Sequence, residues 1–401
     1  MRDIVNAFND LNNYIIKEKF KGYDPNDILS SPFPFKIFGK WAQIIAPQIQ
    51  IRLPFNIRPF WGVKKKINPK GMGILLGAYS KLYRLNPVKR TKENIDIIYN
   101  WLVNNYSQGY SGICWGYPYI WASPDKILKP YTPSIVATSF VAGGIFEYYK
   151  TFKDLKSIYV LRKISKFILN DLKVHEDKKG ICFSYTPIKN DCCFNASMLG
   201  AEALIKLYSI TKDYQLLDIS KQAVDFVVSY QLDSGAWNYS INLKNLRQRN
   251  QMDFHQGYIL DSLFYFIKYS GIKNEKYKTC LSKGLEFYKD NQFYPSGQSK
   301  WRFPATYPIE THHQAQGVIT FAKFSELYPE TIFFSEKILN WTISNMKSSN
   351  GFYYFRKYKY YTDKVSLMRW SQCFMLLAFA EFFLNVNKIE PDKLINIYEI
   401  K

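Results

Sequence analysis

Apolar residues recur along the chain with helical spacing, and the helical stretches are of two alternating kinds. The first kind has apolar residues at i, i+3, i+4 and i+7, and covers 2–19, 91–106, 155–172, 214–231, 274–291 and 333–348. The second kind is rich in Gly, Ala and Ser, and covers 71–83, 134–149, 195–208, 254–269, 313–328 and 368–383. Because small residues let helix backbones approach closely, we expect the second kind to form a crowded inner layer.

The inner stretches begin roughly 55 to 63 residues apart, which indicates an internal repeat of one outer and one inner helix. Six such pairs predict an all-α fold, an (α/α)6 toroid or six-hairpin barrel. We expect one domain over 1–401, with a long loop at 22–69 after the first outer helix. An open solenoid is the alternative, but solenoid repeats are usually shorter, at about 20–47 residues.

Each outer helix leads into a short segment rich in glycine and aromatic residues, such as GICWGYPY (112–119) and GAWNYS (235–240). These segments fall at one end of the ring, so their side chains are expected to meet at a concave mouth. Aromatic residues make up 18% of the chain, and rings in polar loops suit the faces of sugars. The candidates for stacking, each with a core position as its alternative, are Trp115, Tyr117, Tyr119, Trp121, Phe183, Tyr185, Trp237, Tyr239 and Trp301.

Candidate acid and base groups stand just before or at the start of two inner helices. Asp253 and His255 lie in NQMDFHQGY (250–258), where Asp253 has helix capping as its alternative role. Tyr307, Glu310 and His312 lie at the equivalent point of the next repeat. A histidine or tyrosine beside a carboxylate is what general acid–base chemistry on a sugar requires, so all five are predicted catalytic residues.

Two further positions are expected to bind substrate. Arg369 and Trp370 open the last inner helix, and a bidentate arginine suits a uronate carboxylate or a phosphate; a salt bridge at the mouth is the alternative. Asp24 and Asp27 are expected to cap a local turn, unless the long loop brings them to the mouth.

The net charge of +21 is compatible with an anionic polymer, a membrane surface or a general lysine bias. We expect no nucleic-acid partner, because no zinc finger, RNP-like signature or long basic stripe occurs. Residues 31–66 mix aromatic and basic side chains, and either lie on a bilayer as a peripheral contact or pack beneath the mouth.

The chain is expected to be cytoplasmic, because it has no apolar signal-peptide core and no stretch of about 18 apolar residues. The six cysteines show no extracellular framework, which predicts reduced thiols. The adjacent Cys192 and Cys193 would chelate one tetrahedral ion poorly, and neither CxxC nor HExxH occurs, so we predict no metal and no cofactor.

Several segments resemble an uncharacterised family of helical-toroid proteins encoded among polysaccharide biosynthesis genes. The matching segments include 56–83, 132–149, DFHQGYILDSL (253–263), YPIETHHQAQGVIT (307–320) and MRWSQCFML (368–376). The toroid is more distantly similar to six-hairpin glycosidases and to the helical domain of glucuronyl C5-epimerases. The resemblance implies that Tyr307, His255, His312, Arg369 and Trp370 lie at the mouth.

The chain also departs from this family in two loops. Ile120, Ala122 and Pro124 stand where the family has polar residues, and Phe194 stands where a histidine is common. Asn195 remains from that polar set and is a predicted substrate-binding residue. These departures fit a changed substrate or a non-catalytic member.

The leading hypothesis is therefore an enzyme that acts on an oligosaccharide or polysaccharide precursor during surface or exopolysaccharide assembly. For a uronate it predicts proton abstraction, giving epimerisation or elimination; for a neutral glycoside it predicts hydrolysis by Asp253 and Glu310. The alternative is a non-catalytic saccharide-binding or scaffold protein. A terpenoid cyclase or prenyltransferase subunit is disfavoured, because neither a DxDD motif nor a zinc-ligand set occurs. The oligomeric state, the sugar and the reaction stay open.

Overall fold

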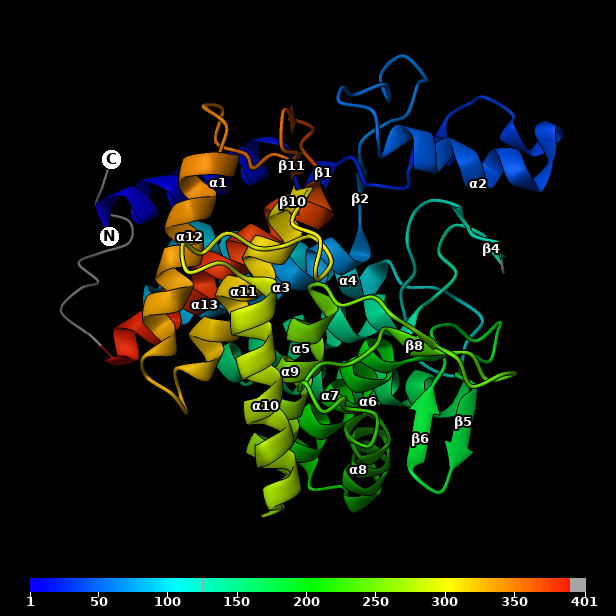
Figure 1. Cartoon of the computed structure of the whole chain (residues 1–401), viewed down its shortest axis with the longest axis vertical. Coiled ribbons are helices and arrows are strands. Elements are labelled where there is room, and N and C mark those ends of the chain that lie inside the picture. The colour runs from blue at the N-terminus through cyan, green and yellow to red at the C-terminus, as the bar shows by residue number, and fades with distance from the viewer. Residues whose placement is uncertain (125, 390–401) are drawn as a thin grey trace.

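The computed structural model describes residues 1–124 and 126–389, and these form two concentric layers of antiparallel helices (Figure 1). The outer helices are α1 (Arg2–Lys17), α4 (Lys89–Asn104), α6 (Leu155–Asn170), α8 (Tyr214–Val228), α10 (Glu275–Gln292) and α12 (Thr331–Met346). The inner helices are α3 (Pro69–Leu85), α5 (Ile135–Phe152), α7 (Phe194–Thr211), α9 (His255–Ser270), α11 (Thr311–Phe324) and α13 (Cys373–Ile389), the last preceded by a π-helical turn, η3 (Met368–Gln372).

The six pairs close into a ring. The last inner helix, α13, packs against the first, α3, while α1 packs against α12 and α13. The predicted (α/α)6 toroid is therefore confirmed, and its main apolar core fills the space between the two layers. The inner stretch predicted to reach residue 328 ends earlier, at Phe324.

A repeated turn joins each of three inner helices to the next outer helix. Asp154, Asp213 and Asn274 are N-caps, and each accepts a hydrogen bond from the backbone N–H two residues later. The residue before the first two caps, Lys153 and Lys212, ends the inner helix in the left-handed region with φ of 56°. These short turns all lie at one end of the ring, which leaves the long loops at the other.

Two glycines explain how closely the inner helices α3 and α5 approach each other. A Cβ atom added to Gly144 would lie 2.2 Å from the backbone oxygen of Gly73. Only glycine fits at such a contact, which is why the inner stretches are rich in small residues.

Small antiparallel sheets join the long loops at the N-terminal ends of the inner helices. One sheet has the order β7–β8–β9 (Cys192–Cys193, Ser240–Ile241, Gln248–Arg249), and another has β10–β11–β12 (Ile309–Glu310, Arg356–Lys357, Thr362–Asp363). Two-stranded sheets are formed by β3 (Trp121–Ala122) with β4 (Ile127–Leu128) and by β5 (Val174–Asp177) with β6 (Gly180–Phe183). In the three-stranded sheets, the strand before an inner helix pairs with a strand from the following loop, so neighbouring loops are held together.

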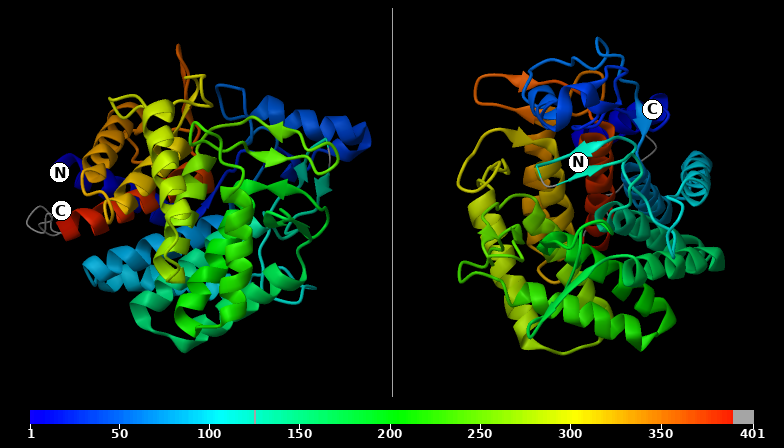
Figure 2. Two further views of the ribbon diagram at one scale, coloured as in Figure 1. Left: turned by 60° about the horizontal axis from the view of Figure 1, so that its bottom comes forward. Right: turned by 90° about the vertical axis from the view of Figure 1, so that its right-hand side faces the viewer.

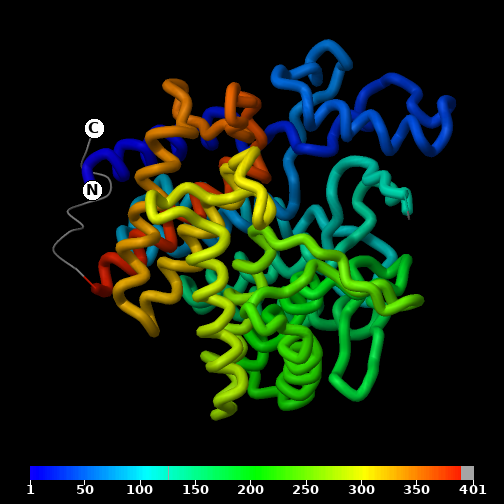
Figure 3. Tube along the Cα trace, viewed as in Figure 1, coloured from blue at the N-terminus to red at the C-terminus, as the bar shows by residue number. Residues whose placement is uncertain are grey.

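The long segment after α1 is a folded excursion rather than a plain loop. Its base is the antiparallel pair β1 (Lys21–Gly22) and β2 (Lys66–Ile67), and it contains η1 (Ile28–Ser30), η2 (Phe35–Phe38) and the helix α2 (Gly39–Gln50). The tube in Figure 3 shows this segment projecting from the body and returning to it. The prediction of a loop at 22–69 missed α2.

No helix among residues 1–124 and 126–389 combines the length and apolar character needed to cross a membrane. All six cysteines are buried free thiols.

Candidate active site

A cavity of about 170 Å³ lies at the N-terminal ends of the inner helices, where the long loops meet. Its polar lining comes from Asn26, Lys70, Asn195, His255 and Arg369. Eight of its fourteen lining residues are aromatic, namely Tyr117, Tyr119, Trp121, Tyr185, Tyr239, Phe254, Tyr258 and Trp370. We call this space the mouth cavity.

One wall of the mouth cavity is a continuous group of aromatic rings. Tyr117 stacks on Tyr119 with ring centroids 5.6 Å apart, and Trp121 meets Tyr117 at 5.9 Å and Tyr185 at 5.4 Å, both edge to face. Burial raises the pKa of Tyr185 well above its usual value. A wall of rings with fixed orientation suits the apolar face of a sugar.

His255 and Asp253 form a dyad at the edge of this cavity. Nδ1 of His255 lies 2.5 Å from Oδ1 of Asp253, and a carboxylate oxygen can only accept, so Nδ1 carries the proton. Asp253 also accepts from the backbone N–H of His255 (3.1 Å) and from Nε2 of Gln251 (2.7 Å). Burial alone would raise the pKa of Asp253, but His255 and these hydrogen bonds lower it below its usual value.

The carboxylate of Asp253 thus binds the first backbone N–H of α9 and orients the imidazole of His255. Since Nδ1 of His255 faces Asp253, Nε2 is the nitrogen available to a ligand, and it has no protein partner among the described residues. An imidazole held in one tautomer by a buried carboxylate is suited to proton transfer.

Lys70 is a charged residue of the mouth cavity that the sequence analysis did not identify. Its side chain is buried, and Nζ lies 4.1 Å from the ring centroid of Phe140 and 5.2 Å from that of Phe374. No carboxylate or carbonyl accepts a hydrogen bond from Nζ in the part of the chain that the structure describes. Burial, reinforced by the positive charge of Arg369, holds the pKa of Lys70 well below its usual 10.5.

Arg369 lines the mouth cavity, but its positive charge is neutralised by an ion pair with Asp24. Nε and Nη2 donate to the two carboxylate oxygens of Asp24 at 2.6 and 2.5 Å, and both side chains are buried. Asp24 also accepts from the hydroxyl of Tyr119 (2.6 Å) and from Nδ2 of Asn68 (3.0 Å). The alternative of a salt bridge at the mouth is therefore the one observed, and Asp24 reaches the rim instead of capping a local turn.

His312 lies behind the cavity wall and does not line the mouth cavity. Its Nδ1 donates to the backbone oxygen of Trp370 (3.0 Å), so Nε2 accepts from the hydroxyl of Tyr258 (2.6 Å). Burial, together with the charges of Lys70 and Arg369, lowers the pKa of His312 well below its usual value. His312 is thus a neutral side chain that holds the hydroxyl of Tyr258 in place. Because both its ring nitrogens bond to the protein, neither is available to a ligand.

Trp115 and Trp237 are core residues, so the expectation that they stack on a ligand needs correction. Both are almost completely buried. Their indole N–H groups donate to backbone oxygens near the ends of outer helices, at Leu102 of α4 (3.3 Å) and Val227 of α8 (3.0 Å). These bonds tie the following loop to the last turn of each outer helix, which gives both tryptophans a structural role.

Three other predicted residues also lie outside the lining of the mouth cavity. Glu310 is buried in β10 and forms an ion pair with Arg356, whose Nε lies 2.6 Å away. Tyr307 is exposed to 39%, and Trp301 is half-buried with the guanidinium of Arg302 over its ring. None of the three is among the residues that line the mouth cavity.

Tyr117, Tyr185, Asn195, His255, Arg369 and Trp370 are the predicted site residues that line the mouth cavity. The Oδ1 atom of Asn195 accepts from the thiol of Cys193 at 3.0 Å. Asp253 joins the set through His255. Lys70 was missed because lysines are abundant in this sequence, although a lysine in the first turn of a glycine-rich inner helix was a usable signal.

A second cavity, of about 90 Å³, lies deeper in the lumen, and Tyr258 lines both cavities. Each inner helix contributes a buried charged side chain to it, and the sign alternates around the ring. We call this set the charged belt: Lys81 (α3), Glu147 (α5), Lys206 (α7), Asp261 (α9), Lys323 (α11) and Glu381 (α13).

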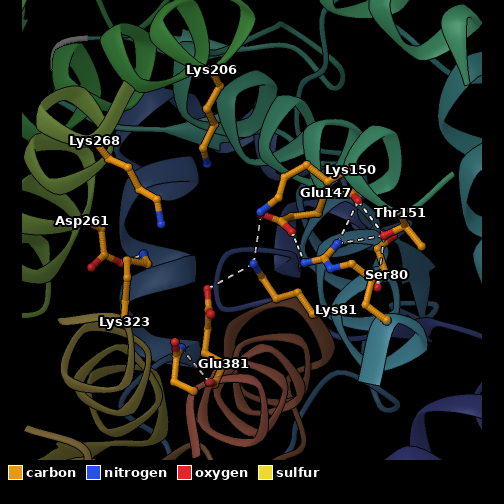
Figure 4. Close-up of polar contacts among 12 residues, drawn as sticks. Ser80, Lys81, Glu147, Lys150, Thr151, Lys206, Asp261, Lys268, Lys323 and Glu381 are labelled. Atoms are coloured by element: carbon orange, nitrogen blue, oxygen red, sulfur yellow. Dashed lines mark hydrogen bonds and ion pairs between the residues drawn. The ribbon is translucent and has the colours of Figure 1, made fainter. Parts of the chain in front are cut away.

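The charged belt is joined across helix boundaries. Nζ of Lys81 lies 3.0 Å from Glu147 and 3.4 Å from Glu381, and Nζ of Lys323 lies 2.7 Å from Asp261. Figure 4 shows the lysines and Glu381 pointing toward one central space. Burial would raise the pKa of Glu147, but Lys81 and other nearby cations hold it well below its usual value.

No protein-family model matches the sequence, and no curated protein matches it. Solved structures share its fold. Cellobiose 2-epimerase from Bacillus thermoamylovorans B4167 aligns with a TM-score of 0.64 and 14% identity, over 80% of this chain and 90% of that chain. A sugar epimerase from a ruminal bacterium aligns with a TM-score of 0.64 and 13% identity, over 85% and 98%.

A GH76 alpha-mannanase from Bacteroides thetaiotaomicron aligns with a TM-score of 0.62 and 16% identity, over 80% of this chain and 87% of that chain. At such identities the likeness establishes the fold alone. The chain is an (α/α)6 toroid of the kind found in six-hairpin glycosidases and sugar epimerases, as its sequence predicts.

Proposed function

We propose that this protein is a carbohydrate-active enzyme that binds a saccharide in the mouth cavity and moves a proton at a sugar carbon. The observation that carries the proposal is the His255–Asp253 dyad, with Nδ1 held by the carboxylate and the ring at the edge of an aromatic cavity. The sugar-active enzymes that share the fold support the substrate class.

The chemistry follows from the groups that line the cavity. Nε2 of His255 takes a proton from a sugar carbon beside a carboxylate or carbonyl group, and the electron pair of the broken C–H bond moves into that group as an enolate. Return of a proton to the opposite face gives an epimer, while loss of the substituent on the next carbon gives an unsaturated sugar. Lys70 lines the same cavity, and its lowered pKa makes its ammonium a better proton donor.

Hydrolysis by a pair of carboxylates has less support. Asp253 is engaged with His255 and Gln251, and Glu310 is engaged with Arg356 outside the cavity lining. A glycosidase needs two carboxyl groups facing the same glycosidic bond. We therefore favour an epimerase or lyase over a hydrolase.

We also propose that the saccharide belongs to the assembly or modification of a surface polysaccharide. The sequence resemblance to a family encoded among polysaccharide biosynthesis genes supports this setting.

The test is proton exchange in deuterated water, followed by NMR, with uronate-containing oligosaccharides and neutral disaccharides as separate substrates. The intact protein is expected to introduce deuterium at one sugar carbon of an accepted substrate. His255→Gln and Asp253→Asn are each expected to slow this exchange about 10²–10⁴-fold, the usual contribution of a positioned acid or base. His175→Gln, on the β5–β6 hairpin away from the cavity, is the matched control and should leave the rate unchanged.

Saturable sugar binding by the intact protein without exchange or product would contradict catalysis. That outcome would favour the non-catalytic saccharide-binding alternative, which the aromatic wall also fits.

A further inference from the structure

The helix α2 turns an apolar stripe toward solvent. Trp41, Ile45 and Ile49 are 66%, 49% and 54% exposed, while the buried residues of the helix are two glutamines, Gln43 and Gln50, with Ile44 and Pro47. In water a helix normally turns its apolar stripe toward the protein core. An apolar stripe turned outward indicates a surface that another apolar phase covers.

The residues around α2 extend this exposed apolar surface. Nine large hydrophobic side chains between residues 33 and 61 are exposed, of 24 such side chains in the described part of the chain. We call them the apolar platform: Phe33, Ile37, Phe38, Trp41, Ile45, Ile49, Phe55, Phe60 and Trp61. Phe60 and Ile37 are the most prominent, at 88% and 79% exposed. A concentration of this kind marks an interaction site.

The positive charge of the same segment indicates an anionic partner. No aspartate or glutamate occurs between Asp27 and Glu93, whereas residues 31–66 contain seven lysines and arginines. Lys36 and Lys64 are exposed and form no ion pair with the described residues. Aromatic and aliphatic side chains beside uncompensated basic ones match an anionic bilayer, where rings enter the headgroup region and lysines face lipid phosphates.

The geometry of the excursion fits contact with one face of a bilayer. Figures 1 and 2 show α2 projecting beyond the helical body in different views. With 12 residues, α2 is about 18 Å long, which is too short to cross a bilayer core of about 30 Å. Nζ of Lys40 donates to the backbone oxygen of Pro124 (2.7 Å), in the loop that also carries the aromatic wall.

We propose that the apolar platform docks on an anionic membrane surface, with α2 lying in the headgroup region and the basic side chains of 31–66 facing lipid phosphates. This docking goes beyond the proposed catalytic function and does not depend on it.

The experiment is co-sedimentation of the full chain with vesicles of phosphatidylcholine alone or of phosphatidylcholine with one quarter phosphatidylglycerol. Binding is expected to the anionic vesicles, and to weaken at least tenfold in 0.5 M salt, because exposed charges are then screened. The double variant Trp41→Ser/Phe60→Ser is expected to bind at least tenfold more weakly, and so is Lys36→Glu/Lys64→Glu. The matched control is Leu155→Ser/Tyr159→Ser on α6, which removes apolar side chains that are also more than half exposed (74% and 60%) but lie outside the platform.

Circular dichroism and the urea midpoint identify variants that keep the native fold, and only these are compared. Absence of sedimentation with anionic vesicles would overturn the proposal, as would equal binding by the platform variants and the control. A concentration-dependent dimer that Trp41→Ser/Phe60→Ser abolishes, without vesicle binding, would assign the surface to self-association and would also overturn it.

Discussion

Lys323 and Asp261 join the neighbouring inner helices α11 and α9 through a buried ion pair of the charged belt. Their side chains are only 7% and 10% exposed, and Nζ lies 2.7 Å from Oδ2. Burial raises the pKa of Asp261 above its usual value, although Lys323 opposes this rise. The variant Lys323→Met keeps most of the side-chain volume but leaves the carboxyl group without its cation.

The expected loss follows from this geometry. At 2.7 Å and an effective dielectric constant of about 20, Coulomb attraction amounts to about 6 kcal/mol, and the desolvation of both ions offsets part of it. Loss of one partner of a buried pair commonly costs about 3–5 kcal/mol. Protonation of Asp261 would remove the unpaired charge and limit this cost. We therefore expect Lys323→Met to lower the free energy of unfolding by about 3 kcal/mol at pH 7.

The assay is urea unfolding followed by tryptophan fluorescence, with the variants compared at a common m value. Lys323→Met/Asp261→Asn removes both charges and keeps an acceptor for Nε2 of Gln316, which donates to Asp261 at 3.0 Å. We expect the free energy of unfolding of this double variant to be about 2 kcal/mol higher than that of Lys323→Met. The control is Lys278→Met, because Lys278 and Glu275 form an exposed pair at the same 2.7 Å and should contribute less than about 0.5 kcal/mol.

The stability of Lys323→Met is also expected to depend on pH. In Lys323→Met the folded-state pKa of Asp261 lies further above its unfolded value, so the folded state holds the proton more tightly. Its deficit against the wild type should therefore shrink as the pH falls from that raised pKa toward the unfolded-state pKa. A loss below about 1 kcal/mol at pH 7, or a double variant no more stable than the single one, would show that water screens this pair and refute the reasoning.

Two further predictions concern other buried positions. Because the pKa of Lys70 is lowered, the unfolded state binds the extra proton at pH values just below 10.5, so the contribution of Lys70 to stability should rise with pH there. The stability of Lys70→Met relative to the wild type should therefore fall as the pH rises in urea titrations, whereas Lys178→Met, at an exposed site, should show no such trend. Gly144→Ala should lower the urea midpoint because its Cβ would meet the backbone of Gly73, whereas Gly143→Ala, one residue earlier in α5, would meet no atom closer than Nζ of Lys206 at 3.8 Å and should not lower it. An unchanged midpoint in Gly144→Ala would contradict the close approach of α3 and α5.

The ring of helices was predictable because two periodic signals agree. Apolar positions at helical spacing define the outer helices, and small residues define the inner ones, so the boundaries match those of the structure closely. The helix α2 was missed for a physical reason. A prediction from hydrophobic patterns assumes that apolar residues face inward. In α2, Trp41, Ile45 and Ile49 face outward, so the pattern predicts an irregular aromatic loop instead of a helix.

The candidate site was only partly predictable, because sequence indicates which residues reach the rim and not what they meet there. Arg369 was correctly expected to be at the mouth, yet Asp24, 345 residues away in the chain, neutralises it. His312 was expected to face a ligand, yet Tyr258 and the backbone of Trp370 occupy both its ring nitrogens. Such long-range pairings depend on how the ring closes, which no local pattern specifies.

The internal repeat separates residues of the scaffold from residues of the site. Trp115 and Trp237 stand in equivalent segments, GICW and GAW, and make the same kind of bond to an outer helix, so their recurrence reflects a structural need shared by these two pairs. The charged belt recurs likewise, with a charged residue shortly before an aromatic one in SKLY (80–83), FEYY (146–149) and IKLY (205–208). The carboxylate and histidine at the start of α9 have counterparts at the start of α11, Glu310 and His312. There Glu310 pairs with Arg356, and both ring nitrogens of His312 bond to the protein. In α9 the carboxylate instead holds Nδ1 of His255 and leaves Nε2 open, and this asymmetry favours a specific ligand over a structural role.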